Sequence, residues 1–343
     1  MNTLPVSFTV EKVPAFGLPV EVAKGIWLIR LSVALAMDHV NVYLLDNGDS
    51  WTMIDTGTNS ATCRSMLETV LSSPDFAVKP LGQVIVTHFH SDHIGLAGHF
   101  TANNTVHLLT SRTCWQTTWM LHNDRPTVPH DANVDFFAKA GMKEIELESF
   151  KRLTPRPYAD GVEELPRSYT RLSEPQELSI GDRKWTVRMG YGHADEHVTL
   201  WSDDNIAIVG DQILPAISPN ISVHFSEPEA DCLSSWLQSC VQFEQLAKVD
   251  TLCLPGHNRP YTGAPFRCRQ LRENCEQVIS RIEAALSRSK TAIDLMADIY
   301  RRDIASNERT ALIGETMGYL NHLHQAGVIR RRVAKRRYVW KRS

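Results

Sequence analysis

Short apolar runs, each closed by a turn-forming or polar residue, recur along the chain and predict buried β-strands. The clearest of them are 84–86 (VIV), 206–209 (IAIV) and 252–254 (LCL). An uninterrupted apolar run of this length is typical of a strand that is buried on both faces. Each run is followed within three residues by histidine or aspartate. We therefore expect polar side chains to gather where these strands end.

A second pattern, with apolar residues three and four positions apart, predicts helices. Residues 231–248 follow it most clearly, with a stripe formed by Leu233, Trp236, Leu237, Cys240, Val241, Phe243 and Leu246. Such a stripe is expected to face the core. The same spacing predicts helices over 114–120, 133–142, 266–287, 291–300 and 308–326. Thr291 and Asp294 have the spacing of a capping box at the start of one of them.

The first two of these helices belong to a long segment, Thr113 to Arg188, in which prolines are frequent before the strands resume. An insertion of this kind commonly covers a binding site, and we expect residues of about 113–175 to do so here. Its residues Trp115, Trp119, His122 and Phe137 either line a pocket or form the core of the insertion. The core is the commoner role for such side chains.

The chain ends in a region of different character. Residues 328–333 and 337–341 predict two short strands joined by a basic turn, directly after two helices. Helix, helix and hairpin in this order resemble a winged-helix module, so we expect a small winged-helix-like domain over 266–343 after a catalytic domain over 1–265. Eight Lys or Arg residues in 330–342 could bind the phosphates of a nucleic acid. Packing or homodimer contacts are the commoner roles of such a tail.

Composition restricts where the protein is expected to act and what class of protein it can be. The chain carries 36 Lys or Arg and 39 Asp or Glu, and its net charge of −3 indicates no dominant nucleic-acid surface. No basic stretch precedes an apolar run at the N-terminus, and no run of about 18 apolar residues occurs, so we expect neither a secretory signal nor a membrane span. Seven cysteines without a Cys-x-x-Cys pair suit a reducing cytoplasm.

The candidate chemistry concentrates in the segment Thr87–His93 (THFHSDH), directly after the first apolar run. Three imidazoles and one carboxylate within six positions are the ligand types that zinc prefers. Alternate residues at a strand end face the same way, so His88 and His90 can point at one metal ion. Asp92 and His93, beyond the turn, can reach a second ion.

Three later segments each supply one further candidate ligand, because a single loop cannot complete a coordination sphere. His193 follows the glycine-containing run 190–192, Asp211 follows Gly210, and His257 follows Pro255-Gly256. Glycine allows the tight turn that each position needs. Strand end, turn and ligand thus occur four times, which is far more specific than any single instance.

In order and approximate spacing these motifs resemble those of the metallo-β-lactamase-fold superfamily, and residues 41–45 and 53–57 resemble its first pair of strands. The resemblance covers about residues 25–265. It implies an α+β fold, a four-layer αββα sandwich, with a dinuclear metal site at one edge. It also implies a ligand set: one metal takes His88, His90 and His193, the other takes Asp92, His93 and His257, and Asp211 bridges both.

The resemblance further implies a mechanism. Two divalent cations bring the pKa of a bridging water toward neutrality, and the hydroxide attacks a carbonyl or a phosphorus. Asp92 is the expected catalytic partner for the proton of that nucleophile, and His197 could bond to substrate or to a ligand carboxylate. Asp55 would hold a ligand imidazole in its tautomer. Zinc is the expected metal, although this ligand set also accepts iron or manganese.

Two positions separate the branches of the superfamily. His90 stands where flavin-linked di-iron reductases carry a carboxylate, and Asp211 stands where one type of β-lactamase carries cysteine. These residues favour the hydroxyacylglutathione-hydrolase, lactonase or nuclease branches. We therefore expect a hydrolase of a small-molecule thioester, ester or lactone. The alternative is an endoribonuclease or other phosphodiesterase whose winged-helix tail binds nucleic acid.

Overall fold

The computed structural model describes residues 6–34, 37–103, 105–305 and 308–343, which form two compact units. Unit 1 comprises the described residues up to Arg125, then 156–219 and 243–267. Unit 2 comprises 126–155, 220–242 and the described residues of 268–343. The boundary expected near residue 265 falls inside helix α8 (Ala264–Ala285). The structure also groups 126–155 and 220–242 with the C-terminal residues, because spatial contacts rather than chain order define the units.

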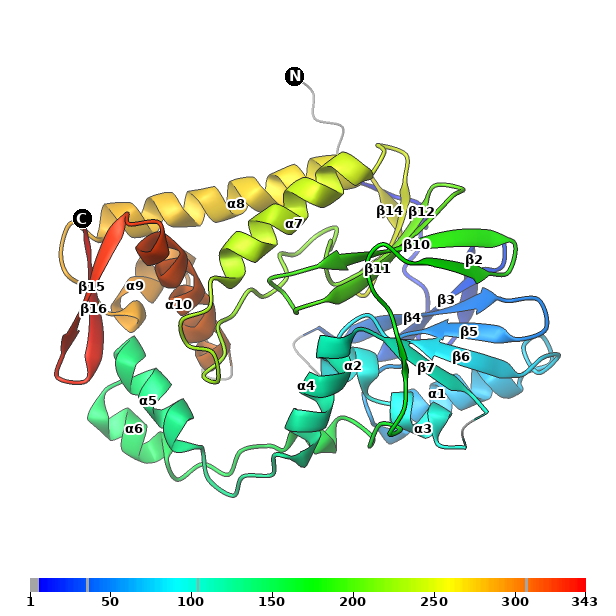
Figure 1. Ribbon diagram of the computed structural model, residues 1–343, viewed down its shortest axis with the longest axis horizontal. Helices are drawn as coiled ribbons and strands as arrows, with labels where there is room; N and C mark the ends of the chain where they lie inside the picture. The colour runs from blue at the N-terminus through cyan, green and yellow to red at the C-terminus, as the bar shows by residue number, and fades with distance from the viewer. Residues whose placement is uncertain (1–5, 35–36, 104, 306–307) are drawn as a thin grey trace. The chain divides into compact units, whose positions relative to one another are not determined.

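Unit 1 is built on two seven-stranded sheets (Figure 1). In spatial order, the first sheet consists of β2 (Pro19–Ala23), β3 (Ile26–Ser32), β4 (His39–Asp46), β5 (Trp51–Ile54), β6 (Leu81–Ile85), β7 (His107–Thr110) and β8 (Thr170–Arg171). The second consists of β1 (Ser7–Phe8), β14 (Tyr261–Thr262), β13 (Leu252–Pro255), β12 (Ile206–Gly210), β11 (His197–Ser202), β10 (Arg183–Gly190) and β9 (Glu177–Ile180).

The layers of unit 1 follow from two apolar clusters. One lies between the sheets and joins residues such as Leu28 and Ile85 of the first sheet to Val187 and Ile208 of the second. The other covers the opposite face of the first sheet with α1 (Ala61–Ser72), α2 (Ser91–Ile94), α3 (Ala97–Thr101) and α4 (Arg112–Asn123). On the outer face of the second sheet, Trp201 stacks on Phe243 of α7 (Cys232–Leu246) with ring centroids 5.7 Å apart. The expected αββα sandwich is confirmed.

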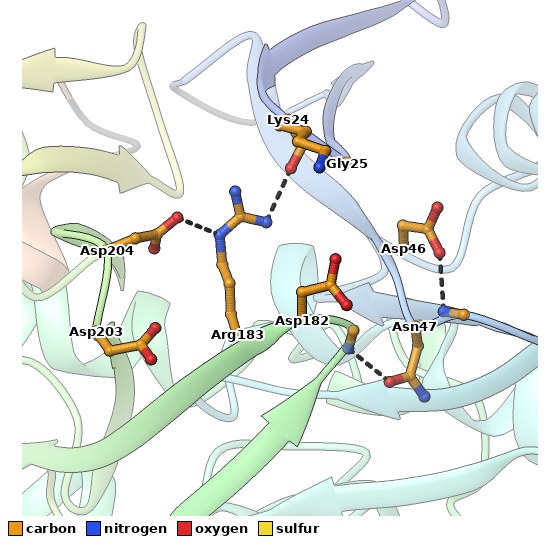
Figure 2. A pocket seen from close by; sticks show the side chains of 10 residues that line it. Lys24, Gly25, Asp46, Asn47, Asp182, Arg183, Asp203 and Asp204 are labelled. Atoms are coloured by element: carbon orange, nitrogen blue, oxygen red, sulfur yellow. Dashed lines mark hydrogen bonds and ion pairs between the residues drawn. The ribbon is translucent and has the colours of Figure 1, made fainter.

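A charged hollow of about 790 Å³ lies at the hairpins between β4 and β5 and between β9 and β10 (Figure 2). Four aspartates line it, but cations already pair with two of them. Nε of Arg183 donates to Asp204 at 2.7 Å, and Lys79 pairs with Asp46. These hairpins are at the strand ends opposite to those that lead to the predicted ligands. The hollow is therefore separate from the candidate chemistry.

Unit 2 contains α5 (Asp131–Ala140), α6 (Glu144–Phe150), α9 (Ala292–Tyr300), α10 (Arg309–Gln325) and a hairpin of β15 (Ile329–Ala334) and β16 (Arg337–Arg342). The capping box is present, because Oγ1 of Thr291 accepts from N–H of Asp294 and the Asp294 carboxylate accepts from N–H of Thr291. Helix, helix and hairpin thus follow in the predicted order, and the winged-helix identification stays a prediction. Within the described ranges, no helix combines the length and apolar character that crossing a bilayer requires.

The expected stripe of α7 is too broad. Leu233, Trp236 and Phe243 are buried, but Val241 and Leu246 are 37% and 36% exposed. At about 100° of rotation per residue, positions 241 and 246 fall outside the face that 233, 236 and 243 define. The aromatic residues of the predicted insertion also have separate roles. Trp115 and Trp119 pack against the helix-covered core of unit 1, whereas Phe137 is buried in unit 2 and contacts Phe150.

Truncation of the core between the sheets should destabilise the fold strongly. Leu28 is fully buried there, so we expect Leu28→Ala to lower the free energy of unfolding by about 2–5 kcal/mol through lost burial and a cavity. Val78→Ala is the control, since Val78 is 73% exposed and its truncation should cost less than about 0.5 kcal/mol. Urea unfolding measures both variants, and equal losses would contradict the assigned core.

Candidate metal centre

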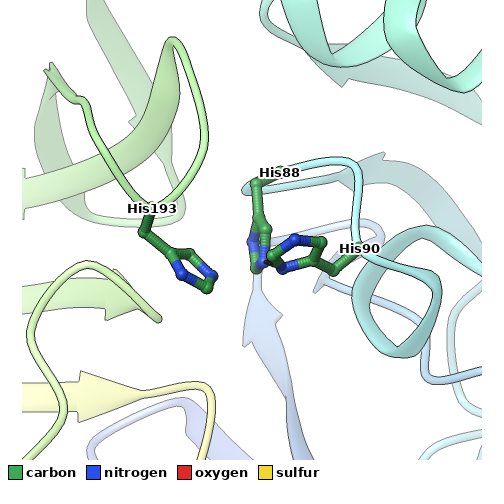
Figure 3. A group of neighbouring side chains, drawn as sticks. All are labelled: His88, His90 and His193. Atoms are coloured by element: carbon green, nitrogen blue, oxygen red, sulfur yellow. Dashed lines mark hydrogen bonds between the residues drawn. The ribbon is translucent and has the colours of Figure 1, made fainter. Parts of the chain in front are cut away.

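The seven predicted ligands converge at one edge of the sandwich, where strands of both sheets end. His88 and His90 follow β6, and Asp92 and His93 lie in the short helix α2 directly after them. The second sheet delivers the others from the ends of β10, β12 and β13: His193, Asp211 and His257. Figure 3 shows His88 and His90 on one side and His193 facing them from the other.

The ligand atoms fall into overlapping groups in which all atoms lie within 4.8 Å of one another. One group is His88, His90 and His193, and another is Asp92, His93 and His257. These are the two metal sets that the sequence predicts. A third group joins Asp211 to one histidine of each set, and its members are His88, His93 and Asp211. The structure thus brings all seven residues together.

Asp211 occupies the centre of the cluster. Its Oδ2 lies 3.5 Å from Nε2 of His93, 3.7 Å from Nε2 of His193 and 3.3 Å from Nε2 of His257. Two atoms that each lie about 2.1 Å from a tetrahedral zinc ion are about 3.4 Å apart. The spacing therefore fits shared coordination better than direct hydrogen bonding, which prefers about 2.9 Å.

Two buried polar atoms support a metal at this place. Nε2 of His93 and Oδ1 of Asp211 are inaccessible to solvent and have no hydrogen-bond partner among the described residues. A buried polar atom normally has a partner, so such orphans call for an ion or a water. The cluster also leaves no room for a side chain at Gly256, because a Cβ there would lie 2.3 Å from Oδ1 of Asp211 and 2.6 Å from Cε1 of His93. The residues present therefore fit divalent metal ions.

Asp55 orients ligands of both predicted sets. Its Oδ2 accepts from Nδ1 of His93 at 2.8 Å and from Oγ1 of Thr87 at 2.8 Å, while Oδ1 accepts from N–H of Thr87 at 2.8 Å. Nδ1 of His88 lies 3.0 Å from Oγ1 of Thr87. Because these bonds occupy the Nδ1 atoms, both imidazoles present Nε2 to the cluster. Asp55 thus has the position that the resemblance implied. Thr87, whose hydroxyl connects Asp55 to His88, was missed by sequence reasoning.

The loop that carries His257 is held by β4. The side-chain amide of Asn41 donates to the carbonyls of Pro255 (2.9 Å) and Asn258 (2.7 Å), and the hydroxyl of Tyr43 donates to Pro255 (2.8 Å). Nδ1 of His257 donates to the carbonyl of His39 at 2.6 Å. Asn41 and Tyr43 were expected only to form a strand, so their role in fixing this loop was also missed.

His197 supports the ligands from behind. It is fully buried, and its ring stacks on that of His88 at 4.6 Å. Its Nε2 accepts from the backbone N–H of Asp211 at 3.2 Å, and Nδ1 bonds to the carbonyl of Val198 at 3.1 Å. The expected bond to a ligand carboxylate is therefore a bond to the ligand's backbone. Both ring nitrogens are engaged, which leaves neither to contact a substrate.

Two further residues anchor ligand loops and were not predicted. The hydroxyl of Tyr158 donates to the carbonyl of Phe89, between the first two histidine ligands. The carboxylate of Glu196 accepts from N–H and Oγ1 of Thr113, both at 2.7 Å, and so ties the loop after His193 to the first turn of α4. No sequence signal identifies such partners, because they are far apart in the chain.

Burial and charge separate the histidines into two classes. Burial lowers the pKa of His88 and of His90 well below the usual value, and neighbouring imidazoles add to this. Burial also opposes a proton on His93, but the carboxylates of Asp211, Asp55 and Asp92 outweigh it and raise the pKa of His93 well above 6.5. The pKa of Asp211 is correspondingly well below its usual value despite burial, because of His93 and His257.

Comparisons with known proteins agree with this geometry. Residues 36–257 match the family model described as "Metallo-beta-lactamase superfamily". The chain is 23% identical over 316 residues to "Probable metallo-hydrolase YqjP" of Bacillus subtilis (strain 168), covering 86% of this chain and 91% of that one. Among solved structures, it is similar to a beta-lactamase domain protein from Burkholderia ambifaria, with 30% identity, a TM-score of 0.89 and coverage of 98% and 97%.

A metallo-beta-lactamase family protein from Thermus thermophilus has the same fold at 21% identity, with a TM-score of 0.76 and coverage of 94% of this chain and all of that one. The chain belongs to the metallo-beta-lactamase superfamily. Because a histidine and aspartate cluster suited to metal lies at one edge of its sandwich, it is a metal-dependent hydrolase of that superfamily.

The stabilisation that metal provides should increase with pH. Without metal, the raised pKa of His93 stabilises the fold fully below about pH 6.5, and this contribution is lost as the pH rises through the folded-state pKa. The lowered pKa of Asp211 stabilises the fold above about pH 4. Metal binds the neutral imidazole, so it must displace the proton at low pH. We expect the Tm difference between metal-loaded and metal-free protein to grow from about pH 6 to 8.5, and a constant difference would contradict this assignment.

Gly256→Ala should impair metal binding by steric contact alone. The added Cβ would meet Asp211 and His93, so we expect metal content to fall by at least about half while the sandwich still folds. Gly82→Ala is the control, because its Cβ would meet the side chain of Ser50 in a different part of unit 1. Elemental analysis with circular dichroism measures both, and normal metal content in Gly256→Ala would disprove the proposed packing around Asp211.

Proposed function

We propose that the chain is a dinuclear metal-dependent hydrolase of a small molecule with a thioester, ester or lactone bond. The central position of Asp211 is the observation that carries this proposal. Its Oδ2 lies 3.3–3.7 Å from histidines of both predicted sets, as a bridging carboxylate must. Zinc is the proposed metal, and iron or manganese would suit the same ligands.

The proposed ligand sets are those that the geometry groups. His88, His90 and His193 would hold one ion, Asp92, His93 and His257 would hold the other, and Asp211 would be shared. Bound divalent ions lower the pKa of water toward neutrality and polarise the bond that is hydrolysed. Asp55 and His197 would keep the ligands in place without contacting the substrate.

Asp92 is the residue that we propose accepts the proton of the attacking water. Its Oδ2 lies 3.4 Å from Nε2 of His257, and 12% of its side chain is exposed, against 8% for that of Asp211. A carboxylate at the edge of the cluster can both receive a proton and release it to solvent. Coordination of Asp92 by a metal ion would limit its ability to accept this proton.

The charge of the ligand loops favours an acyl substrate over a phosphodiester. The stretches 55–59, 88–93, 192–197, 211–214 and 255–258 contain no Lys or Arg. Arg259, which follows the last stretch, is engaged elsewhere, because it donates to the backbone carbonyls of Val10 and Glu11. A neutral ester or thioester needs no cation besides the metals, whereas enzymes commonly bind phosphate oxygens with Arg or Lys. A reducing compartment, which we propose to be the cytoplasm, suits the seven cysteines.

Removal of the bridging charge tests the dinuclear site. We expect Asp211→Asn to lose about one of two metal ions per chain and to lower hydrolysis at least about 100-fold, since a neutral amide cannot bridge two cations well. Asp49→Asn, in an exposed turn, is the control for the loss of one carboxylate. Metal content and activity that both equal those of the wild type would refute the proposal.

Substrate class is tested with the same preparation. Acyl thioesters, simple esters, lactones and a labelled single-stranded RNA would be assayed with equal metal loading. Turnover of an acyl substrate that depends on Asp211 supports the proposal. Cleavage of RNA without acyl turnover would instead support the alternative phosphodiesterase.

A further inference from the structure

The C-terminal hairpin sorts its cations onto two faces. Side chains alternate between the faces of a strand, and β15 and β16 pair with Arg330 opposite Lys341 and Ala334 opposite Arg337. One face of the hairpin therefore carries Arg330, Arg332, Arg337 and Lys341, which we call the basic face. The other face carries the buried aromatic residues Tyr338 and Trp340.

The two cations on the other face, Arg331 and Arg342, have partners within unit 2. Arg331 binds both carboxylate oxygens of Glu229 at 2.8 and 2.6 Å and lies over the ring of Tyr338. Arg342 lies 3.7 Å from Glu283. By contrast, none of the four cations of the basic face forms an ion pair with any residue that the structure describes. Arg331 and Arg342 thus take part in ion pairs of the fold, whereas the cations of the basic face can bind an anion from outside the chain.

The turn of the hairpin holds two cations in an unfavourable backbone conformation, although one of them, Arg336, lies 3.8 Å from Asp135. Lys335 and Arg336 form the two-residue turn, and both have positive φ, 49° and 65°. Such turns strongly prefer Asn-Gly, because other residues meet steric strain there. Residues held in such conformations cluster at functional sites. Arg330 and Lys341, which are like charges directly across the strands, are also destabilising.

The local charge is opposite to that of the rest of the chain. Residues 328–343 contain eight Lys or Arg and no Asp or Glu, whereas the remaining residues contain 28 Lys or Arg against 39 Asp or Glu. The cations of the basic face repeat at intervals of about 7–14 Å along the strands. A partner must present negative charges over the same span, and a nucleic-acid strand carries one about every 3.4 Å of its axis.

We propose that the basic face and its turn bind the phosphate backbone of a nucleic acid, without regard to base sequence. A membrane is less suited to this surface. Membrane-surface elements bury large apolar side chains beside their cations. The basic face offers only Ala334 and Val339 for that purpose, and the hairpin's aromatic residues are buried on the other face. This proposal does not depend on the substrate of the metal centre.

Binding would be measured with the full-length, metal-loaded protein and a short labelled RNA or DNA of mixed sequence, whose integrity is checked on a gel. With about four phosphate contacts to a single strand, the logarithm of affinity should fall with the logarithm of salt concentration with a slope of about −3. Arg330→Gln/Arg332→Gln should weaken binding about 50-fold at low salt and reduce the slope by about 1.4. Arg152→Gln/Arg288→Gln, which removes two exposed arginines elsewhere in unit 2, should leave affinity within about twofold.

A turn variant separates binding from stability. Lys335→Asn/Arg336→Gly places the preferred residues in the turn, so it should raise Tm while weakening binding roughly tenfold. A purely structural turn would gain stability without any loss of affinity. The proposal is overturned if the wild type does not bind nucleic acid at low salt, or if the control pair weakens binding as much as the basic-face pair. Preferential binding to phosphatidylserine vesicles through the same residues would assign the surface to a membrane instead.

Discussion

The carboxylate of Asp55 is the contact on which the metal centre depends. It is 2% exposed, it has a positive φ of 57°, and it accepts hydrogen bonds from Thr87 and His93. A buried carboxylate is tolerated only when donors surround it, and here the donors belong to the segment that supplies the ligands. Loss of this carboxylate would leave several buried donors unsatisfied, at about 1–3 kcal/mol each. The same bonds that stabilise Asp55 therefore fix the tautomers of His93 and, through Thr87, of His88.

The distance between the two halves of the ligand set is fixed by the core between the sheets. One sheet ends in the segment 88–93, and the other ends at His193, Asp211 and His257. Leu28, Val187 and Ile208 fill the space between these sheets and are almost completely buried. Protein cores are close-packed and resist changes in volume, so the sheets cannot move apart by even an ångström without loss of contacts. The apolar core therefore determines the positions of the predicted ligands, because it sets the spacing of the two sheets whose strands end at them.

Local patterns in the sequence predicted that polar side chains gather where strands end, and the resemblance of these motifs to the superfamily implied the sandwich and the seven predicted ligands. Most of the predicted ligands follow an apolar run, His193 follows a strand that ends in Gly190, and strand ends of a sandwich meet at a common edge. What local patterns cannot provide is a contact between distant segments. Nε2 of His197 accepts from N–H of Asp211, and Tyr158 donates to Phe89, yet neither bond leaves a trace in residue spacing. For the same reason the grouping of 126–155 with the C-terminal residues could not be read from chain order.

Charge has different functions in the two units. In unit 1 the one cation in the loop that carries His257, Arg259, donates to the backbone carbonyls of Val10 and Glu11, and the carboxylates of Asp211, Asp55 and Asp92 raise the pKa of His93 well above 6.5. A lysine or arginine beside these carboxylates would compete with a metal ion for them. In unit 2 the hairpin keeps like charges opposite each other at Arg330 and Lys341, and cations with positive φ at Lys335 and Arg336. The carboxylates of unit 1 suit a metal cation, and the hairpin of unit 2 suits the polyanion that we propose for it.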